Sequence, residues 1–83
     1  MTQVFVSASA PTARDAREEI NLALQNAGYD ERVEEKDYIS ESRDTDAAFA
    51  GEVFATFAID IDDTLESVTD ALRGTGISVE PVE

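Results

Sequence analysis

The sequence predicts an α+β fold in which a four-stranded antiparallel sheet carries two helices on one face. Three observations predict it. Residues 47–61, AAFAGEVFATFAIDI, place apolar side chains at every second position, which is the period of a strand with one buried face. Two other stretches carry apolar side chains at the spacing of an amphipathic helix. The elements follow one another as strand, helix, strand, strand, helix, strand, an order that one layer of sheet and one layer of helices can accommodate.

The first predicted strand covers residues 3–9, QVFVSAS. Val4 and Val6 lie on one face of this strand, and Phe5 lies on the other. Pro11 cannot continue the pairing, so we expect the strand to end before it.

A helix is predicted to follow, with Thr12 as its N-cap and Gly28 as the residue that ends it. The apolar positions form one helical stripe, which consists of Ala13, Ala16, Ile20, Ala23, Leu24 and Ala27. Leu22 falls on the polar side of this helix. It is either an isolated surface leucine or part of a contact.

The segment 32–42, RVEEKDYISES, has the weakest pattern. Val33 and Ile39 would share one face of a strand, but the two acidic residues between them on that face could not be buried unpaired. We therefore expect an edge strand with a bulge, or one whose inward side is covered only at its ends. The alternative is that residues 30–46 form a disordered acidic loop.

The short polar link 43–46 is predicted to be a hairpin turn into the central strand, residues 47–61. The odd positions of that strand are predicted to be core, namely Phe49, Val53, Ala55, Phe57, Ile59 and Ile61. Its even positions mix polar residues with Phe54, so they indicate a face that is more apolar than an ordinary solvent-exposed surface.

The second helix is predicted over three turns after Ile61. Asp63 and Glu66 have the spacing of a capping box, and Gly74 ends the helix. Its inward stripe consists of Leu65, Val68, Ala71 and Leu72. The last strand, ISVEPVE, has Ile77 and Val79 on one face.

Right-handed crossovers in both halves favour a ferredoxin-like βαββαβ sandwich, with the first and third strands in the middle of the sheet. With 83 residues we expect a single domain over 1–83 and one modest core. A long apolar stretch is absent from the sequence, so we expect a soluble, cytoplasmic protein.

The charge balance is the strongest global signal. Nineteen acidic residues against six basic ones give a net charge of -13, while 42% of residues are apolar and fall in periodic segments. A disordered acidic chain lacks such segments, so this chain is expected to fold. In composition it resembles proteins of halophilic archaea, whose carboxylate surfaces remain hydrated in molar salt. Cysteine and histidine are absent, which removes thiolate chemistry and the usual group for proton transfer near neutral pH.

The segment Asp60-Ile61-Asp62-Asp63-Thr64-Leu65 resembles the first motif of haloacid-dehalogenase-type phosphatases. The resemblance implies Asp60 as nucleophile, Asp62 as general acid and base, and Mg²⁺ between them. Such enzymes also need a downstream lysine and a parallel sheet, whereas the residues after Leu65 contain no lysine. We therefore expect these aspartates to cap the next helix, and we expect no enzyme, no catalytic residues, no bound metal and no cofactor.

Phe5 and Phe54 resemble the base-stacking aromatic residues of RNA-recognition-motif domains, with Gly51 at the glycine of the longer motif. The resemblance implies RNA binding across the sheet. The sequence departs from the motif at Ala50, where a basic residue is usual, and at Glu52, where an aromatic residue is usual.

Protein contact is the competing interpretation, and the one we favour. Phe5, Tyr38, Phe54 and Ala58 would form an apolar patch on an acidic domain, and such a patch is typical of an interface. We expect a small binding or assembly module that forms a homodimer through the open sheet face. A plainer alternative is that the two phenylalanine rings only cover each other on a monomer. A ligand-binding regulatory domain is a third possibility, which no residue of the sequence specifically favours.

Overall fold

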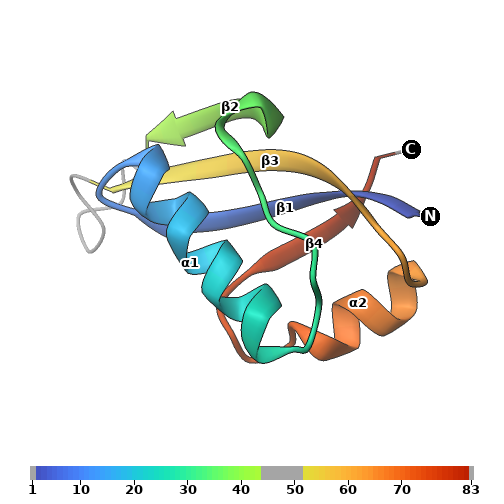
Figure 1. The fold of residues 1–83 in the computed structure, drawn as a ribbon. Helices are drawn as coiled ribbons and strands as arrows, with labels where there is room; N and C mark the ends of the chain where they lie inside the picture. The colour runs from blue at the N-terminus through green and yellow to red at the C-terminus, as the bar shows by residue number, and fades with distance from the viewer. Residues whose placement is uncertain (1, 44–51, 83) are drawn as a thin grey trace.

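Four antiparallel strands form one sheet. The computed structural model describes residues 2–43 and 52–82 (Figure 1). Its strands are β1 (Thr2–Ala10), β2 (Tyr38–Arg43), β3 (Val53–Ile61) and β4 (Ser78–Pro81). They lie in the order β2-β3-β1-β4, and every neighbouring pair is antiparallel. The first and third strands therefore occupy the middle of the sheet, as predicted.

Two helices, α1 (Ala13–Asn26) and α2 (Leu65–Ala71), lie on the same side of this sheet (Figure 1). Both contribute to a single buried cluster with the inward side chains of β1 and β3. Its completely buried members are Val4, Val6, Ala16, Ile20, Leu24, Ala55, Ile61 and Val68. The predicted α+β fold, a four-stranded antiparallel sheet with two helices, is confirmed. The predicted core positions of β3 are confirmed from Val53 to Ile61, whereas Phe49 lies outside the described residues.

Helix α1 has the ends that its sequence predicts. The hydroxyl oxygen of Thr12 accepts a hydrogen bond from the backbone N–H of Asp15 at 3.1 Å, which satisfies one of the free donors of the first turn. At the other end Gly28 has a φ of +90°, a conformation that side chains disfavour. This turn lets the backbone N–H groups of Gly28 and Tyr29 donate to the carbonyl oxygens of Gln25 and Leu24, so the last carbonyls of α1 are paired.

The predicted strand over 32–42 is wrong in its first half. Residues 32–34 are irregular, residues 35–37 form a short 3₁₀ helix, and strand pairing begins only at Tyr38. Val33 is 3% exposed, but it is buried from a loop. The side-chain amide of Asn21 explains this conformation, because it accepts from the N–H of Val33 at 2.6 Å and donates to its carbonyl oxygen at 3.0 Å. These two bonds replace the pairing that a strand would have provided.

The predicted bulge is present in β2. Its register against β3 shifts between Tyr38, which lies opposite Phe57, and Ser40, which lies opposite Thr56. Ile39 occupies the extra position and is 51% exposed, so it does not share a buried face with Val33. The hairpin turn was predicted over 43–46; Arg43 belongs to β2 instead, and residues 44–46 lie outside the described residues.

The second helix is shorter than predicted and has a different cap. It runs over two turns instead of three, and its N-cap is Thr64, whose hydroxyl accepts from the N–H of Ser67 at 3.1 Å. Asp63 was the predicted cap but lies one residue too early. The helix ends at Ala71 because glycines at 74 and 76, both with φ of +85°, carry the chain through a turn into β4.

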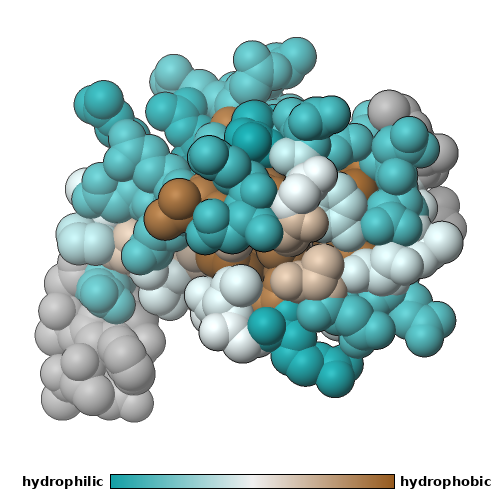
Figure 2. All heavy atoms as spheres, turned by 60° about the horizontal axis from the view of Figure 1, so that its bottom comes forward, coloured by the Kyte–Doolittle hydropathy of each residue, from teal (hydrophilic) through white to brown (hydrophobic). Residues whose placement is uncertain are grey.

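The helix side of the molecule carries mostly hydrophilic side chains, with small hydrophobic areas between them (Figure 2). Within residues 2–43 and 52–82, no helix has both the length and the apolar character needed to span a membrane.

Candidate interaction face

The sheet face opposite the helices is the candidate site, and we call it the open face. No helix of the described residues lies over it, since both lie on the other side (Figure 1). The strand registers assign its side chains, because residues directly opposite in an antiparallel pair share a face. They are Gln3, Phe5, Ser7, Ser9, Ser40, Ser42, Phe54, Thr56, Ala58, Asp60, Ser78 and Glu80.

A row of hydroxyl side chains crosses the middle of the open face. It consists of Ser40 on β2, Thr56 on β3, Ser7 on β1 and Ser78 on β4, each opposite the next. The hydroxyl oxygens of Ser7 and Thr56 are 2.9 Å apart and share a hydrogen bond. Ser7 is only 7% exposed, so the middle of this face is closely packed and presents short, uncharged side chains.

Phe5 and Ala58 lie on one side of the hydroxyl row. They are directly opposite each other, and Glu80 lies opposite Phe5 on the other neighbouring strand. Phe5 and Ala58 are both partly buried. This part of the face is therefore apolar in its centre and acidic at the β4 edge.

Phe54 lies on the other side of the hydroxyl row, between Ser9 and Ser42. It is 37% exposed, which is high for a phenylalanine. Phe54 is four residues from Ala58 along β3, a separation of about 13 Å. Because Phe5 lies opposite Ala58, this separation keeps the two phenylalanine rings apart, and mutual coverage of the rings receives no support.

Tyr38 is not part of the open face. Its ring packs edge to face against Phe57 on the helix side, with ring centres 5.9 Å apart and an angle of 73° between the planes. Its hydroxyl donates to a carboxylate oxygen of Glu41 at 2.9 Å, and this bond raises the pKa of Tyr38. Of the four residues predicted to form the patch, the structure thus brings Phe5, Phe54 and Ala58 onto one face. The bulge at Ile39 is the reason that simple alternation misplaces Tyr38.

The hydroxyl row was not predicted. Its signal in the sequence is the alternation of serine at 7 and 9 and again at 40 and 42, which places serine on one side of two strands. Serine is uncommon in the middle of strands, so this repetition distinguishes the face from an ordinary charged surface. Two residues of the motif that resembles RNA-recognition-motif domains, Ala50 and Gly51, lie outside the described residues.

The aspartates at the end of β3 and directly after it have different surroundings. Asp60 lies on the open face opposite Gln3, and the backbone N–H of Asp62 donates to a carboxylate oxygen of Glu31 at 2.9 Å. One oxygen of Asp63 accepts from the hydroxyl of Tyr29 at 2.8 Å, and the other accepts from the N–H of Thr64 at 2.8 Å.

These contacts shift the pKa values of Tyr29 and Asp63 in opposite directions. Burial, followed by the hydrogen bond to Asp63, raises the pKa of Tyr29 from 10.0 to about 12. The same hydrogen bond, with the one from Thr64, lowers the pKa of Asp63. Among residues 2–43 and 52–82, acidic side chains do not gather in any group suited to hold a metal ion. The geometry therefore supports a structural role for Asp63.

Comparisons with protein-family models, with curated proteins and with solved structures find no match for this chain.

Proposed function

We propose that this chain is a small, non-catalytic binding module that forms a homodimer by packing its open face against that of a second copy. The observation that carries the proposal is the distribution of charge. In a chain with a net charge of -13, Asp60 and Glu80 are the only charged side chains on the open face of the described strands. Depletion of charge is characteristic of the centre of a protein interface.

The charge also determines which faces of two copies can meet. Two copies with a net charge of -13 repel each other, so they approach most easily where neither presents carboxylates. Asp60 lies beyond Ala58 on β3, and Glu80 lies on the edge strand β4. The hydroxyl row and Phe54 are uncharged. A two-fold axis near the Ser7 and Thr56 pair would place the hydroxyl rows together.

The size of the face sets the expected strength of this contact. Four strands at about 4.8 Å spacing and about seven residues in length present roughly 450 Å² per copy. Two such faces bury about 900 Å² in total, which is below the standard size of stable interfaces and typical of weak, transient ones. We therefore expect a dissociation constant in the micromolar range, decreasing at high salt as the repulsion is screened and apolar burial is strengthened.

Light scattering coupled to size exclusion at about 2 M salt tests the proposal. Wild type is expected to have the mass of a dimer at about 100 μM, whereas Phe54→Glu and Ser42→Glu, which place a carboxylate on the uncharged part of the face, are expected to be monomers. Leu22→Glu is the matched control, because Leu22 is 58% exposed on α1 and away from the sheet. A monomeric wild type would contradict the proposal. So would Phe54→Glu and Ser42→Glu variants that remain dimers like the Leu22→Glu control.

RNA binding through Phe5 and Phe54 receives less support from the same face. Glu80 lies opposite Phe5, and none of the open-face positions of the described strands carries lysine or arginine. Phosphate groups would thus meet a carboxylate and no cation. An RNA titration in molar KCl distinguishes the two functions, since binding that is lost in Phe5→Ala would favour RNA over self-association.

We also propose the ferredoxin-like sandwich as the specific topology. The strand order β2-β3-β1-β4 and the position of both helices on one face support this assignment. The composition supports a cytoplasm with a high salt concentration as the environment.

A further inference from the structure

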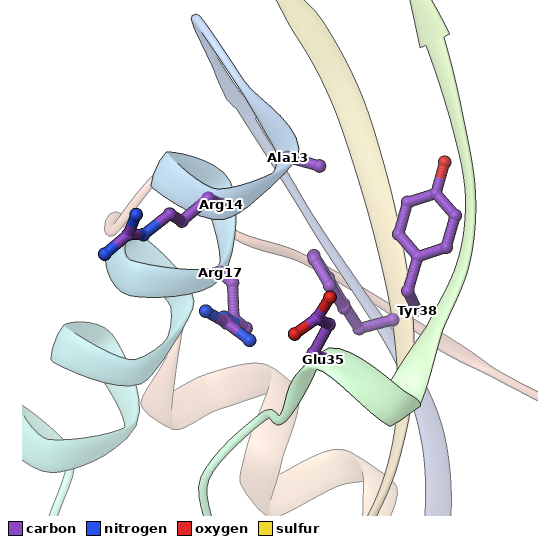
Figure 3. A pocket seen from close by; sticks show the side chains of 6 residues that line it. Ala13, Arg14, Arg17, Glu35 and Tyr38 are labelled. Atoms are coloured by element: carbon purple, nitrogen blue, oxygen red, sulfur yellow. The ribbon is translucent and has the colours of Figure 1, made fainter.

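A cavity lies on the helix side of the sheet, between the start of α1 and the edge strand β2. Its volume is about 570 Å³, which is within the range of small-molecule sites. It is lined by Ala13, Arg14, Arg17, Glu35, Tyr38 and Phe57 (Figure 3). This cavity is separate from the open face, so it does not depend on the proposed dimer.

Two aromatic rings form the apolar wall of the cavity. Phe57 is 2% exposed and belongs to the core, and the ring of Tyr38 packs against it edge to face. Tyr38 itself is 40% exposed, because α1 packs over the central strands and leaves the edge strand partly uncovered. A flat apolar group could lie along the exposed ring of Tyr38, which Phe57 supports from the core.

Arg17 is the distinctive polar group of the cavity. It is partly buried, and among the described residues it makes neither an ion pair nor a hydrogen bond. The other four cations with described side chains have partners: Arg14 with Glu18, Lys36 with Glu34, Arg73 with Asp70, and Arg32 with the carbonyl oxygens of Tyr29 and Glu31. In a chain with three times as many acidic as basic residues, a cation directed into a cavity without such a partner indicates an anionic ligand.

Glu35 limits which anions fit. Its side chain and that of Arg17 extend into the same space from opposite walls, whereas Arg14 extends away from Tyr38 (Figure 3). Arg17 and Glu35 do not form an ion pair, so a ligand group has access to the guanidinium. A carboxylate across the cavity disfavours a second negative charge on the ligand.

We propose that this cavity binds a small organic monocarboxylate with an aromatic or branched apolar body. The carboxylate pairs with the guanidinium of Arg17, and the apolar body lies against Tyr38, beside the small exposed part of Phe57. Glu35 selects against dianions such as phosphate monoesters.

A titration with 3-phenylpropionate, followed by amide chemical shifts of the full chain, tests the proposal. Up to about 20 mM probe, which suffices to detect millimolar affinity, we expect saturable shifts in residues 13–17, 35–38 and 57. Phenylphosphonate, with two negative charges, and the uncharged 3-phenylpropanol are expected to bind at least about tenfold more weakly. An absence of saturable shifts, shifts confined to other residues, or stronger binding of the dianion would overturn the assignment.

Two variants separate the contact from the net charge. Arg17→Gln is expected to weaken 3-phenylpropionate binding about tenfold, whereas Arg73→Gln removes the same charge in the turn after α2 and is expected to leave the affinity unchanged. Glu35→Gln is expected to bring the affinity for phenylphosphonate close to that for the monocarboxylate. All three positions are at or near the surface, and the dispersion of the amide spectrum checks that each variant is folded. Equal affinities for wild type and Arg17→Gln would refute the role of Arg17.

Discussion

The hydrogen bond between Tyr29 and Asp63 joins the turn after α1 to the start of α2. Its length of 2.8 Å and its partial burial make it the best-defined polar contact between these two segments. Its effect on stability depends on pH, because the bond lowers the pKa of Asp63 and, together with the larger effect of burial, raises the pKa of Tyr29. Asp63 determines the change in stability at acid pH, and Tyr29 determines the change at alkaline pH.

Asp63 contributes stability that is fully present above its ordinary pKa of 3.8 and is lost as the pH falls through its lower folded value. Tyr29 contributes stability that is fully present below pH 10.0 and is lost as the pH rises towards about 12. We therefore expect wild type to be more stable than Tyr29→Phe between pH 5 and 9, and the difference to shrink below pH 3.8. Urea unfolding at a series of pH values measures it.

The Asp63→Asn background is the control for this prediction. Without a titrating group at position 63, the effect of Tyr29→Phe should no longer change between pH 2 and 5. A difference between wild type and Tyr29→Phe that is constant over this range would show that the bond does not perturb Asp63.

Single positions differ in how well the sequence predicts them. Thr12 and Gly28 were predicted correctly, since a cap and a helix stop depend on neighbours within a few residues. The bond between Tyr29 and Asp63 joins residues 34 positions apart, so no local sequence pattern predicts it. Asp63 has the spacing of a cap, and only the long-range bond to Tyr29 distinguishes its role.

Among the elements, the loop before β2 shows where periodicity is insufficient. Val33 looked like a strand residue because it is apolar, yet it is buried from a loop that Asn21 holds against α1. Strands β1 and β3 were predictable because each has a continuous buried face. The edge strand was predicted with its bulge, but its start and the face of Tyr38 were not, because its inward side includes the exposed Tyr38 and Glu41 and the bulge interrupts its alternation.

We expect Asn21→Ala to lower the free energy of unfolding by about 2 kcal/mol or more. The substitution leaves the partly buried N–H and carbonyl of Val33 without their partners, and each such loss costs about 1–3 kcal/mol. Asn21→Asp, which keeps the acceptor and loses the donor, should fall between wild type and Asn21→Ala. Urea unfolding monitored by circular dichroism measures all three.

Gln25→Ala is the matched control, because Gln25 is exposed one turn later on the same helix. Its effect should be within about 0.5 kcal/mol of zero. If Asn21→Ala and Gln25→Ala had equal effects, the Asn21 side chain would not be what holds the loop.

For the whole molecule, the dominant electrostatic effect is repulsion among carboxylates. The three ion pairs between described residues are all exposed, and each contributes at most about 1 kcal/mol. Screening of these ion pairs by salt therefore lowers the free energy of unfolding only slightly. Screening of a net charge of -13, by contrast, relieves repulsion over the entire surface.

We therefore expect the midpoint of thermal unfolding to rise by about 10 °C or more when NaCl is increased from about 0.1 M to about 2 M. A variant with Glu19, Asp30 and Glu66 changed to their amides should show a smaller rise, because these exposed carboxylates add to the repulsion. Circular dichroism at both salt concentrations measures it. A midpoint that falls with salt, or an identical rise in the variant, would contradict this account.

The sheet order has a consequence for how the chain folds. Strand β1 begins at residue 2 and pairs with β3 and β4, so Val4 lies opposite both Ile59 and Pro81. A nascent chain that ends at α2 has β1 paired on one side only, with its other edge open to a second chain. The sheet is completed only when residues 78–81 have been synthesised. Because the partners of β1 lie more than 40 residues away along the chain, folding is expected to be slower than in a helical protein of this size.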